Sequence, residues 1–253
     1  MIKVVLLGGG NLAFHLTNCL LAAKNVELVQ VYNRSINKIE YLKSKTLITS
    51  NLLDLIEADI YIIAVSDDAI SDLSSKLNFK NKLVVHTSGA ASLKVLKSKS
   101  QQGVFYPLQT FSKDKKINFS NIPICIEADS ESNLILLEKL AKTISKNCYN
   151  INSEQRKHLH VAAVFVNNFV NHLYHIGNQI CDKNNIPFEI LLPIIKETAV
   201  KIESLSPFEA QTGPAKRNDL KTIKNHKSIL NKHQKEIYTL LTKSIYATYG
   251  KKL

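Results

Sequence analysis

The sequence predicts an α/β fold in which a parallel sheet domain over residues 1–152 is followed by an all-helical domain over 153–253. The first part alternates short β-branched runs with helical patterns, and from about Ser153 only helical spacing remains. Strands that alternate with helices of about ten residues are typical of a parallel sheet covered on both faces. A chain of 253 residues has room for one large domain or two modest ones.

Six runs in the first part predict strands, and four segments between them predict helices. The strand runs are KVVLLG (3–8), VELVQVY (26–32), DIYIIAV (59–65), KLVVHT (82–87), QGVFYPL (102–108) and PICIEA (123–128). The helical segments are 12–23, 36–44, 67–77 and 130–146. In the second part we expect helices over 154–182 and 187–204, a loop at 205–219, and two further helices that end near Tyr249. Asn152 followed by Gln155 predicts a capping box at the first of these helices.

Composition argues against several classes of protein. The net charge of +12 comes almost entirely from scattered lysines, with three arginines and no dense basic block, so we expect no nucleic-acid partner. No apolar run approaches the roughly 18–20 residues that span a bilayer, and no signal-peptide layout opens the chain. The four cysteines form no C-x-x-C pair, so we expect no zinc and no disulfide framework. These features predict a soluble cytoplasmic protein.

The stretch VVLLGGGNLAFHL holds a glycine-rich turn between the first predicted strand and helix. It places Gly8, Gly10 and Ala13 in the pattern G-x-G-x-x-(G/A), with Asn11 and Leu12 opening the helix. In this pattern the first glycine permits the tight turn and the second allows a pyrophosphate to approach the helix N-terminus. The alternative is a plain turn that binds nothing. In this context we interpret the turn as the dinucleotide site of a Rossmann-type domain.

The residues after the second strand distinguish the two nicotinamide cofactors. An NAD site usually ends this strand with Asp or Glu on the ribose hydroxyls. Here the chain continues Asn33-Arg34-Ser35, and Lys38 lies one turn further on. Arg34 can hold a 2′-phosphate in a fork, so we expect NADP, although a solvated arginine is the simpler alternative. Ala64, Val65 and Ser66 follow another strand and should lie along the same cofactor.

Two polar segments follow strands in the same way. Ser88, in HTSGA (86–90), is expected to bind a substrate carboxylate or carbonyl, or else to cap a strand-to-helix turn. Gln109, in YPLQTF (106–111), is expected to contact a ligand with its uncharged amide.

These features together resemble the 6-phosphogluconate dehydrogenase and pyrroline-5-carboxylate reductase superfamily over nearly the whole chain. Within it, the chain is most similar to a bacterial group of Rossmann-like NADP oxidoreductases whose C-terminal helical domain has no known function. The matching segments are HTSGA, YPLQTF, HLHVAAVFVNNF (158–169) and TGPAKRND (212–219), the last with Asn218 where Gly is expected. The resemblance implies an NADP-linked reductase that is a homodimer through its helical domain.

The segment 158–175 carries four of the eight histidines and three asparagines, without a single lysine or glutamate. On an α-helical wheel, Asn167, Asn171 and His175 lie within about 60° of His160, with Asn168 just to one side. The alternatives are a solvated stripe and a stripe that lines a cleft; a metal site of His172 and His175 is less favoured.

Hydroxyacid dehydrogenases of the superfamily often carry a catalytic lysine in this helix, with an asparagine one turn later. Here His160 lies near the expected lysine, and Asn168 follows two turns on. We therefore expect His160 to donate the proton, and Ser88, Asn168 and Gln109 to orient the substrate. The sequence predicts an NADPH-dependent reductase of a small carbonyl or imine compound. The missing lysine supports the alternative of an NADP-binding sensor or dimeric interaction module without turnover.

Overall fold

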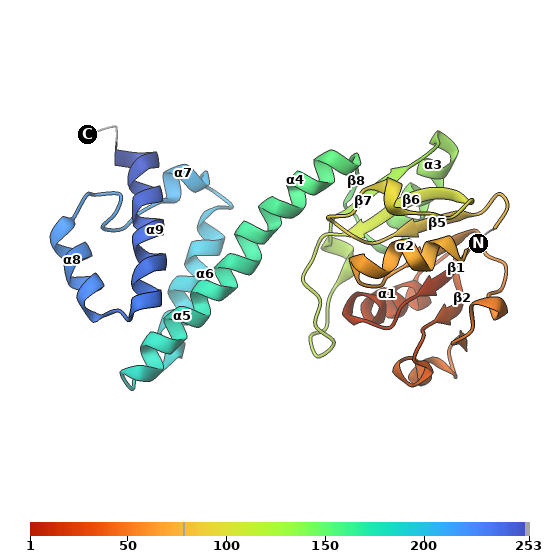
Figure 1. Ribbon diagram of the computed structural model, residues 1–253, viewed down its shortest axis with the longest axis horizontal. Coiled ribbons are helices and arrows are strands. Elements are labelled where there is room, and N and C mark those ends of the chain that lie inside the picture. Colours follow the sequence, from red (N-terminus) through yellow and green to blue (C-terminus); the bar gives the residue numbers. More distant parts are fainter. Residues whose placement is uncertain (78, 251–253) are drawn as a thin grey trace. The chain divides into compact units, whose positions relative to one another are not determined.

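In the computed structural model an N-terminal sheet with surrounding helices is followed along the chain by helices alone (Figure 1). The structure describes residues 1–77 and 79–250, so the end of the predicted helical domain, 251–253, lies outside the described residues. The described chain divides into two compact units, the N-terminal unit Met1–Val164 and the helical unit from Phe165 onward. No helix among the described residues is long and apolar enough to cross a bilayer.

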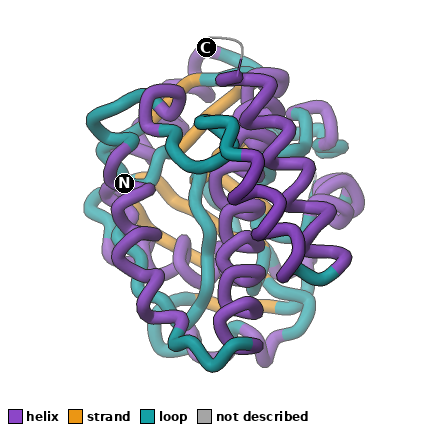
Figure 2. The backbone as a smooth tube through the Cα atoms, turned by 90° about the vertical axis from the view of Figure 1, so that its left-hand side faces the viewer, coloured by secondary structure: helices purple, strands orange, loops and turns teal. Residues whose placement is uncertain are grey.

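All strands of the described chain belong to one sheet (orange in Figure 2) with the order β3-β2-β1-β4-β5-β6-β7-β8. The strands are β1 Ile2–Leu7, β2 Val26–Tyr32, β3 Leu47–Thr49, β4 Ile60–Ile63, β5 Leu83–His86, β6 Gln101–Pro107, β7 Ile124–Ala128 and β8 Cys148–Asn150. The α/β fold is confirmed, with one correction: β6 and β7 pair antiparallel, while every other pair is parallel. The sequence patterns did not single out β3 and β8, which are only three residues long and therefore carry too little pattern to detect.

The central strands of the sheet are buried on both faces. Along β1, Val4 and Leu6 pack into one apolar cluster with α1 and α3, whereas Val5 and Leu7 pack into a second cluster with α2. This alternation is the reason that β1 is apolar at every position from 4 to 7, as expected for a central strand covered by helices on both sides.

The helices of the N-terminal unit are α1 Asn11–Ala22, α2 Asp67–Ser75, α3 Glu131–Ile144 and α4 Ser153–Ala163. The helix predicted over 36–44 is wrong, because this segment forms two 3₁₀ turns, Ile36–Lys38 and Glu40–Leu42. Its two fully buried side chains, Ile39 and Leu42, are three residues apart. That spacing matches the three-residue period of a 3₁₀ turn better than the 3.6-residue period of an α-helix.

The helical unit contains α5 Val170–Lys183, α6 Leu192–Lys201, α7 Pro207–Ala210, α8 Leu220–Ile229 and α9 Lys232–Tyr249. The capping box of Asn152 and Gln155 at the start of α4 is confirmed by both reciprocal hydrogen bonds. The single α-helix predicted over 154–182 is interrupted by a π-helix at Val164–Phe169. Because a π-helix bonds each residue to the fifth rather than the fourth one along, the wheel at 100° per residue does not hold beyond Val164.

Two turns of the helical unit differ from simple expectation. Pro187 does not open α6 but precedes a 3₁₀ helix at Phe188–Leu191, and a second proline, Pro193, lies in the first turn of α6. Asn218, which occupies a position where the resemblance predicts glycine, has a φ of 53°. Asparagine is one of the few residues that adopt this left-handed conformation readily, so the substitution preserves the turn.

The two units differ in how they bury apolar side chains. Within the described part of the N-terminal unit, 37 hydrophobic residues are buried and 7 large ones are exposed. Within residues 165–250, only Cys181, Ala215 and Ile223 are buried hydrophobics, and 17 large ones are exposed. The helical unit thus leaves much of its apolar surface in contact with solvent.

Candidate functional site

The glycine-rich turn has the geometry that a dinucleotide site requires. Gly8 follows β1 with a φ of 145°, and a Cβ on it would lie 2.1 Å from the carbonyl oxygen of Ala64. No larger residue fits there. Gly10 forms the N-cap of α1, and a Cβ on it would meet nothing within 4 Å. The backbone therefore faces open space at the start of the helix, where amide groups and the helix dipole favour an anion.

Two adjoining cavities lie along this turn. The first, about 330 Å³, is lined by Gly9, Gly10, Asn11, Leu12, Asn33, Lys38, Ala64, Val65, Ser66 and Thr87. The second, about 270 Å³, is lined by Gly8, Tyr32, Asn33, Arg34, Leu52, Val65, Ser66, Ala69, Asp72, Leu73 and Lys76. Asn33, Val65 and Ser66 line both cavities, so the two adjoin past the ends of β1, β2 and β4, and we call them together the channel. A dinucleotide fits this arrangement, because its pyrophosphate would meet the glycine turn and its adenosine the apolar residues of the second cavity.

The predicted cofactor residues gather around this channel. Ten of them line it, and the remaining one, Ser35, accepts a hydrogen bond at 2.8 Å on its backbone oxygen from the Asn33 amide. Arg34, Ser35 and Lys38 are exposed. The segment that follows β2 thus supplies two cations and no carboxylate, while Asp72 of α2, which lines the second cavity, is paired with Lys76 at 2.7 Å. This arrangement favours an extra phosphate group.

The loop after β5 continues this edge of the sheet. Thr87 lines the first cavity and donates a hydrogen bond from its hydroxyl to the Ile63 carbonyl oxygen at 3.2 Å. Ser88 is buried, and its hydroxyl oxygen accepts hydrogen bonds from the backbone N–H groups of Ala90 and Ala91, at 3.2 and 2.9 Å. The structure therefore gives Ser88 the role of stabilising the turn.

Next to this loop, Tyr106 and His160 form a pair over Gly89. The Tyr106 hydroxyl oxygen and the His160 Nδ1 are hydrogen-bonded at 3.3 Å, and the rings meet edge-on with centroids 6.3 Å apart. A Cβ on Gly89 would lie 2.7 Å from both of these polar atoms. Only glycine therefore lets the loop, the end of β6 and α4 approach so closely.

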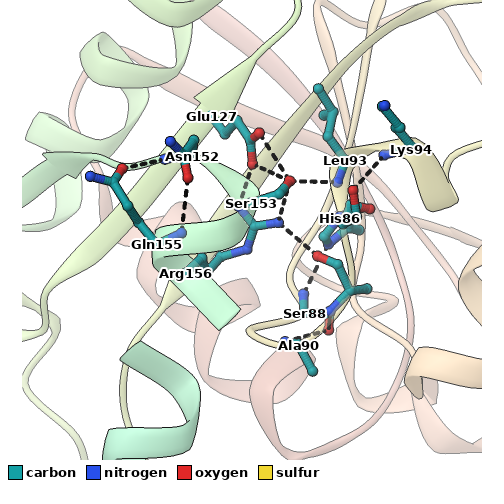
Figure 3. A network of polar contacts seen from close by, with 12 residues as sticks. His86, Ser88, Ala90, Leu93, Lys94, Glu127, Asn152, Ser153, Gln155 and Arg156 are labelled. Atoms are coloured by element: carbon teal, nitrogen blue, oxygen red, sulfur yellow. Dashed lines mark hydrogen bonds and ion pairs between the residues drawn. The ribbon is translucent and has the colours of Figure 1, made fainter. Parts of the chain in front are cut away.

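A buried ion pair fixes α4 to the sheet. Arg156 is 1% exposed, and its guanidinium forms an ion pair with Glu127 of β7 and donates to the Ala91 carbonyl oxygen at 2.7 Å (Figure 3). Ser153 donates to Glu127 and accepts from the backbone N–H of Leu93 at 2.9 Å. The first turn of α4 is thus bonded to the 86–93 loop, and His160 follows one turn later on the same helix.

His86 lies beneath this network and is fully buried. Its Nδ1 accepts a hydrogen bond from the Ser88 N–H at 3.1 Å, so its Nε2 carries the proton and donates to the Ser92 carbonyl oxygen at 3.3 Å. Burial, together with the nearby charge of Arg156, lowers the pKa of His86 to about 4. His86 is therefore a neutral structural group of the loop at physiological pH.

The structure does not bring all predicted substrate residues together. The Gln109 side chain is exposed and accepts a hydrogen bond from the Thr110 N–H at 2.8 Å, so it does not join the Tyr106–His160 pair. Asn168 is exposed in the π-helix of the helical unit. Within the described residues no group of three or more His, Cys, Asp or Glu side chains is arranged to hold a metal ion.

Sequence reasoning missed Tyr106 and Arg156. Tyr106 begins the YPLQTF segment, at the carboxyl end of a predicted strand, but only the amide of Gln109 was singled out. Arg156 belongs to no motif, although it lies four residues before His160, which places both on one side of a helix. Their positions relative to the strand end and to His160 are the signals that could have identified them.

Comparison with known proteins assigns the chain to a family. Residues 3–89 match the family described as NADP oxidoreductase coenzyme F420-dependent, and residues 122–245 match a domain of unknown function, DUF2520. The crystal structure of a candidate NADP oxidoreductase, BF3122 from Bacteroides fragilis, is 39% identical with a TM-score of 0.88, covering 97% of this chain and 98% of that one. This chain belongs to the same family as BF3122.

More distant structures share the fold. Protein TM1727 from Thermotoga maritima is 22% identical with a TM-score of 0.74, and the match covers 98% of both chains. An imine reductase from Myxococcus stipitatus, solved in complex with NADP+, is 14% identical with a TM-score of 0.67, covering 98% of this chain and 96% of that one. No curated protein matches the chain. These distant matches show that the fold is shared over nearly the whole chain.

Proposed function

We propose that this chain is an NADP-dependent oxidoreductase that reduces a small carbonyl or imine compound. The observation that carries the proposal is the channel along the glycine turn, with Arg34 and Lys38 and no carboxylate at the end of β2. The family membership and the NADP+ complex of the imine reductase support the same cofactor. Bound NADPH would supply the hydride.

The residues of the chain divide the remaining tasks. Gly8 and Gly10 admit the pyrophosphate, and Arg34, Ser35 and Lys38 hold the 2′-phosphate by charge-assisted hydrogen bonds. His160 supplies the proton, either directly or through the Tyr106 hydroxyl to which it is hydrogen-bonded at 3.3 Å, since it lies beside the loop that follows β5. The hydroxyl group of Ser88 and the amide of Asn168 orient the substrate, together with the exposed amide of Gln109.

The active form in this proposal is a cytoplasmic homodimer associated through the helical unit. Within residues 165–250, 17 large apolar side chains are exposed and three hydrophobics are buried, which supports a partner that covers this unit. A second copy of the chain is the occupant we propose, because self-association buries the same face on both protomers. All four cysteines are unpaired, as is usual for a protein of the reducing cytoplasm.

The proposal is tested by NADPH oxidation with a panel of small cyclic imines, ketones and aldehydes. We expect turnover of at least one class, with Arg34→Ala raising the KM for NADPH and leaving the KM for NADH unchanged. Lys24→Ala, which removes an exposed lysine of the N-terminal unit away from the channel, is the matched control. NADPH binding without turnover of any compound would favour the sensor instead, and no binding of NADPH would overturn the proposal.

A further inference from the structure

The Tyr106–His160 pair lies on the edge of the sheet that carries the cofactor channel. β4, β5 and β6 are parallel neighbours, so their carboxyl ends share one edge. Val65 and Thr87, which follow β4 and β5, line the channel there. His86 pairs with Val104, and Tyr106 therefore lies two residues closer to that edge on the next strand. In parallel sheets of this type the ligand lies outside the carboxyl ends of the strands.

Tyr106 is the better fixed member of the pair. It is part of the sheet and pairs with Cys125 of β7, and Gly89 leaves space for its hydroxyl group. His160 approaches the same hydroxyl from α4 with Nδ1, and its side chain is partly exposed to solvent. If Nδ1 carries the proton, it donates to the Tyr106 oxygen, and the phenolic hydrogen is free to be donated elsewhere.

The surroundings keep the phenol protonated. Burial raises the pKa of Tyr106 to about 12, and Cys125 and Asp67 add to this effect while Arg156 opposes it. These groups and His160 are the titratable and charged side chains that face the phenol from β7, α2 and α4. The phenol is therefore neutral, and able to give a proton, throughout the range in which the protein would be assayed.

We propose that Tyr106 is the group that donates the proton to the substrate, and that His160 acts behind it as the relay that restores that proton. The inference rests on the proposed function and names a catalytic residue for it. Reduction of a C=N bond takes a hydride at carbon, supplied by NADPH, and a proton at nitrogen. The Tyr106 O–H bond breaks as the N–H bond forms, the Nδ1–H of protonated His160 then returns a proton to the phenolate oxygen, and His160 regains one from water.

The first arm of the test measures the position of Tyr106 without requiring turnover. NADP+ is added to the full-length protein with selectively labelled tyrosine, and NMR records contacts between tyrosine ring protons and the nicotinamide ring. We expect direct nuclear Overhauser effects from Tyr106, identified by their absence in Tyr106→Phe, and none from Tyr149, an exposed tyrosine of β8. Absence of any effect from Tyr106 in the saturated complex would overturn the proposal.

The second arm measures rates with the compound that the wild-type protein reduces. Tyr106→Phe should lower kcat by about 10²–10⁴-fold, as for loss of a general acid, with the Kd for NADPH unchanged. His160→Gln should lower kcat less, because water can reprotonate the phenolate slowly. Tyr149→Phe and His158→Gln, which change exposed residues, are the matched controls.

The outcomes separate this inference from the proposed function. If His160→Gln abolishes turnover while Tyr106→Phe behaves like Tyr149→Phe, His160 donates directly and the inference is overturned. If the wild-type protein binds NADP+ but reduces nothing, the proposed function fails, and the NMR arm still decides whether Tyr106 faces the nicotinamide. A strong effect of Tyr106→Phe together with the nicotinamide contact supports the inference.

Discussion

The two units of this chain bury their apolar side chains to very different extents. Among its described residues, the N-terminal unit buries 37 hydrophobic residues around an eight-stranded sheet and exposes seven large apolar side chains. The helical unit has three buried hydrophobics and 17 exposed large ones within residues 165–250. The first unit therefore has a complete hydrophobic core. The second unit instead exposes many apolar side chains, which an interface with another protomer would bury.

This difference explains where each kind of functional group lies. The cofactor channel, the Tyr106–His160 pair and the Arg156–Glu127 ion pair all belong to the N-terminal unit, where a rigid sheet can hold polar groups in fixed positions. The helical unit offers apolar surface, and in our account its main contribution is to associate with a second copy. The predictions below test this contrast, from the largest expected effect to the smallest.

Arg156→Met should break the N-terminal unit. It leaves the Glu127 carboxylate, which is 16% exposed, without its partner, and removing one member of a buried pair costs about 3–5 kcal/mol. Denaturant unfolding followed by circular dichroism measures the loss. Lys142→Met, which breaks the exposed Lys142–Glu138 pair, is the matched control and should change stability little. Equal effects of the two substitutions would show that the Arg156 network does not stabilise the unit.

Acid should weaken the same unit through His86. Unfolded histidine takes up a proton below about pH 6.5, whereas folded His86 does so only below about pH 4. The unfolded state therefore binds more protons in this window, and stability falls as the pH drops from about 6.5 to 4, by about 3 kcal/mol in total.

Unfolding midpoints measured across this pH range check the prediction. His86→Gln keeps a hydrogen-bond donor for Ser92 and should flatten the dependence, while the exposed His158→Gln should leave it as in the wild-type protein. A dependence that is equally steep in His86→Gln would assign it to other groups.

Val166→Asp should break the association of the helical unit. Val166 is 74% exposed, so the protomer loses no internal packing, but a carboxylate in the proposed interface should weaken the dimer by at least about 100-fold. Sedimentation over a range of concentrations measures the dimer Kd. Leu53→Asp, at a 92% exposed position of the N-terminal unit, should have no effect. A wild-type protein that is monomeric at all concentrations would contradict the proposal that the helical unit associates with a second copy.

Gly89→Ala should have the smallest effect of the series and should be confined to the site. The new methyl group would lie 2.6–2.7 Å from Tyr106 and His160, and both side chains would have to move apart. We expect about a tenfold loss of kcat, near 1.4 kcal/mol, with unchanged NADPH affinity. Gly177→Ala, whose added Cβ would meet only side-chain atoms at 3.9–4.0 Å, is the control for a glycine substitution and should leave kcat as it is.

The sequence predicted those parts of the fold that depend on local pattern. The spacing of apolar residues and the residue types at turns were sufficient to predict β1, the glycine turn, the capping box of α4 and the all-helical second part. These signals gave a wrong prediction at 36–44, where the buried side chains are three residues apart and the segment forms 3₁₀ turns. They also failed at Val164–Phe169, where a π-helix interrupts a continuous helical pattern. The antiparallel pairing of β7 depends on contacts between strands, for which a single sequence holds no local signal.

The candidate site shows the same division. The cofactor residues follow from a motif within short stretches of chain, and the structure places them around one channel. The Tyr106–His160 contact joins residues 54 positions apart, and the Arg156–Glu127 pair joins residues 29 apart. Such pairs are set by tertiary packing, and the sequence does not show which side chains meet. For this reason the sequence pointed to Gln109 rather than to Tyr106 of the same segment.

The central claim is that the channel at the glycine turn holds NADPH through the cations at the end of β2, and calorimetric titration tests it most directly. The wild-type protein is titrated with NADPH and with NADH, and the titrations are repeated with Arg34→Ala. The account predicts that NADPH binds at least about tenfold more tightly than NADH and that Arg34→Ala removes this preference, a change of about 1.4 kcal/mol. Equal binding of the two cofactors by the wild-type protein, or no binding of either, would contradict it.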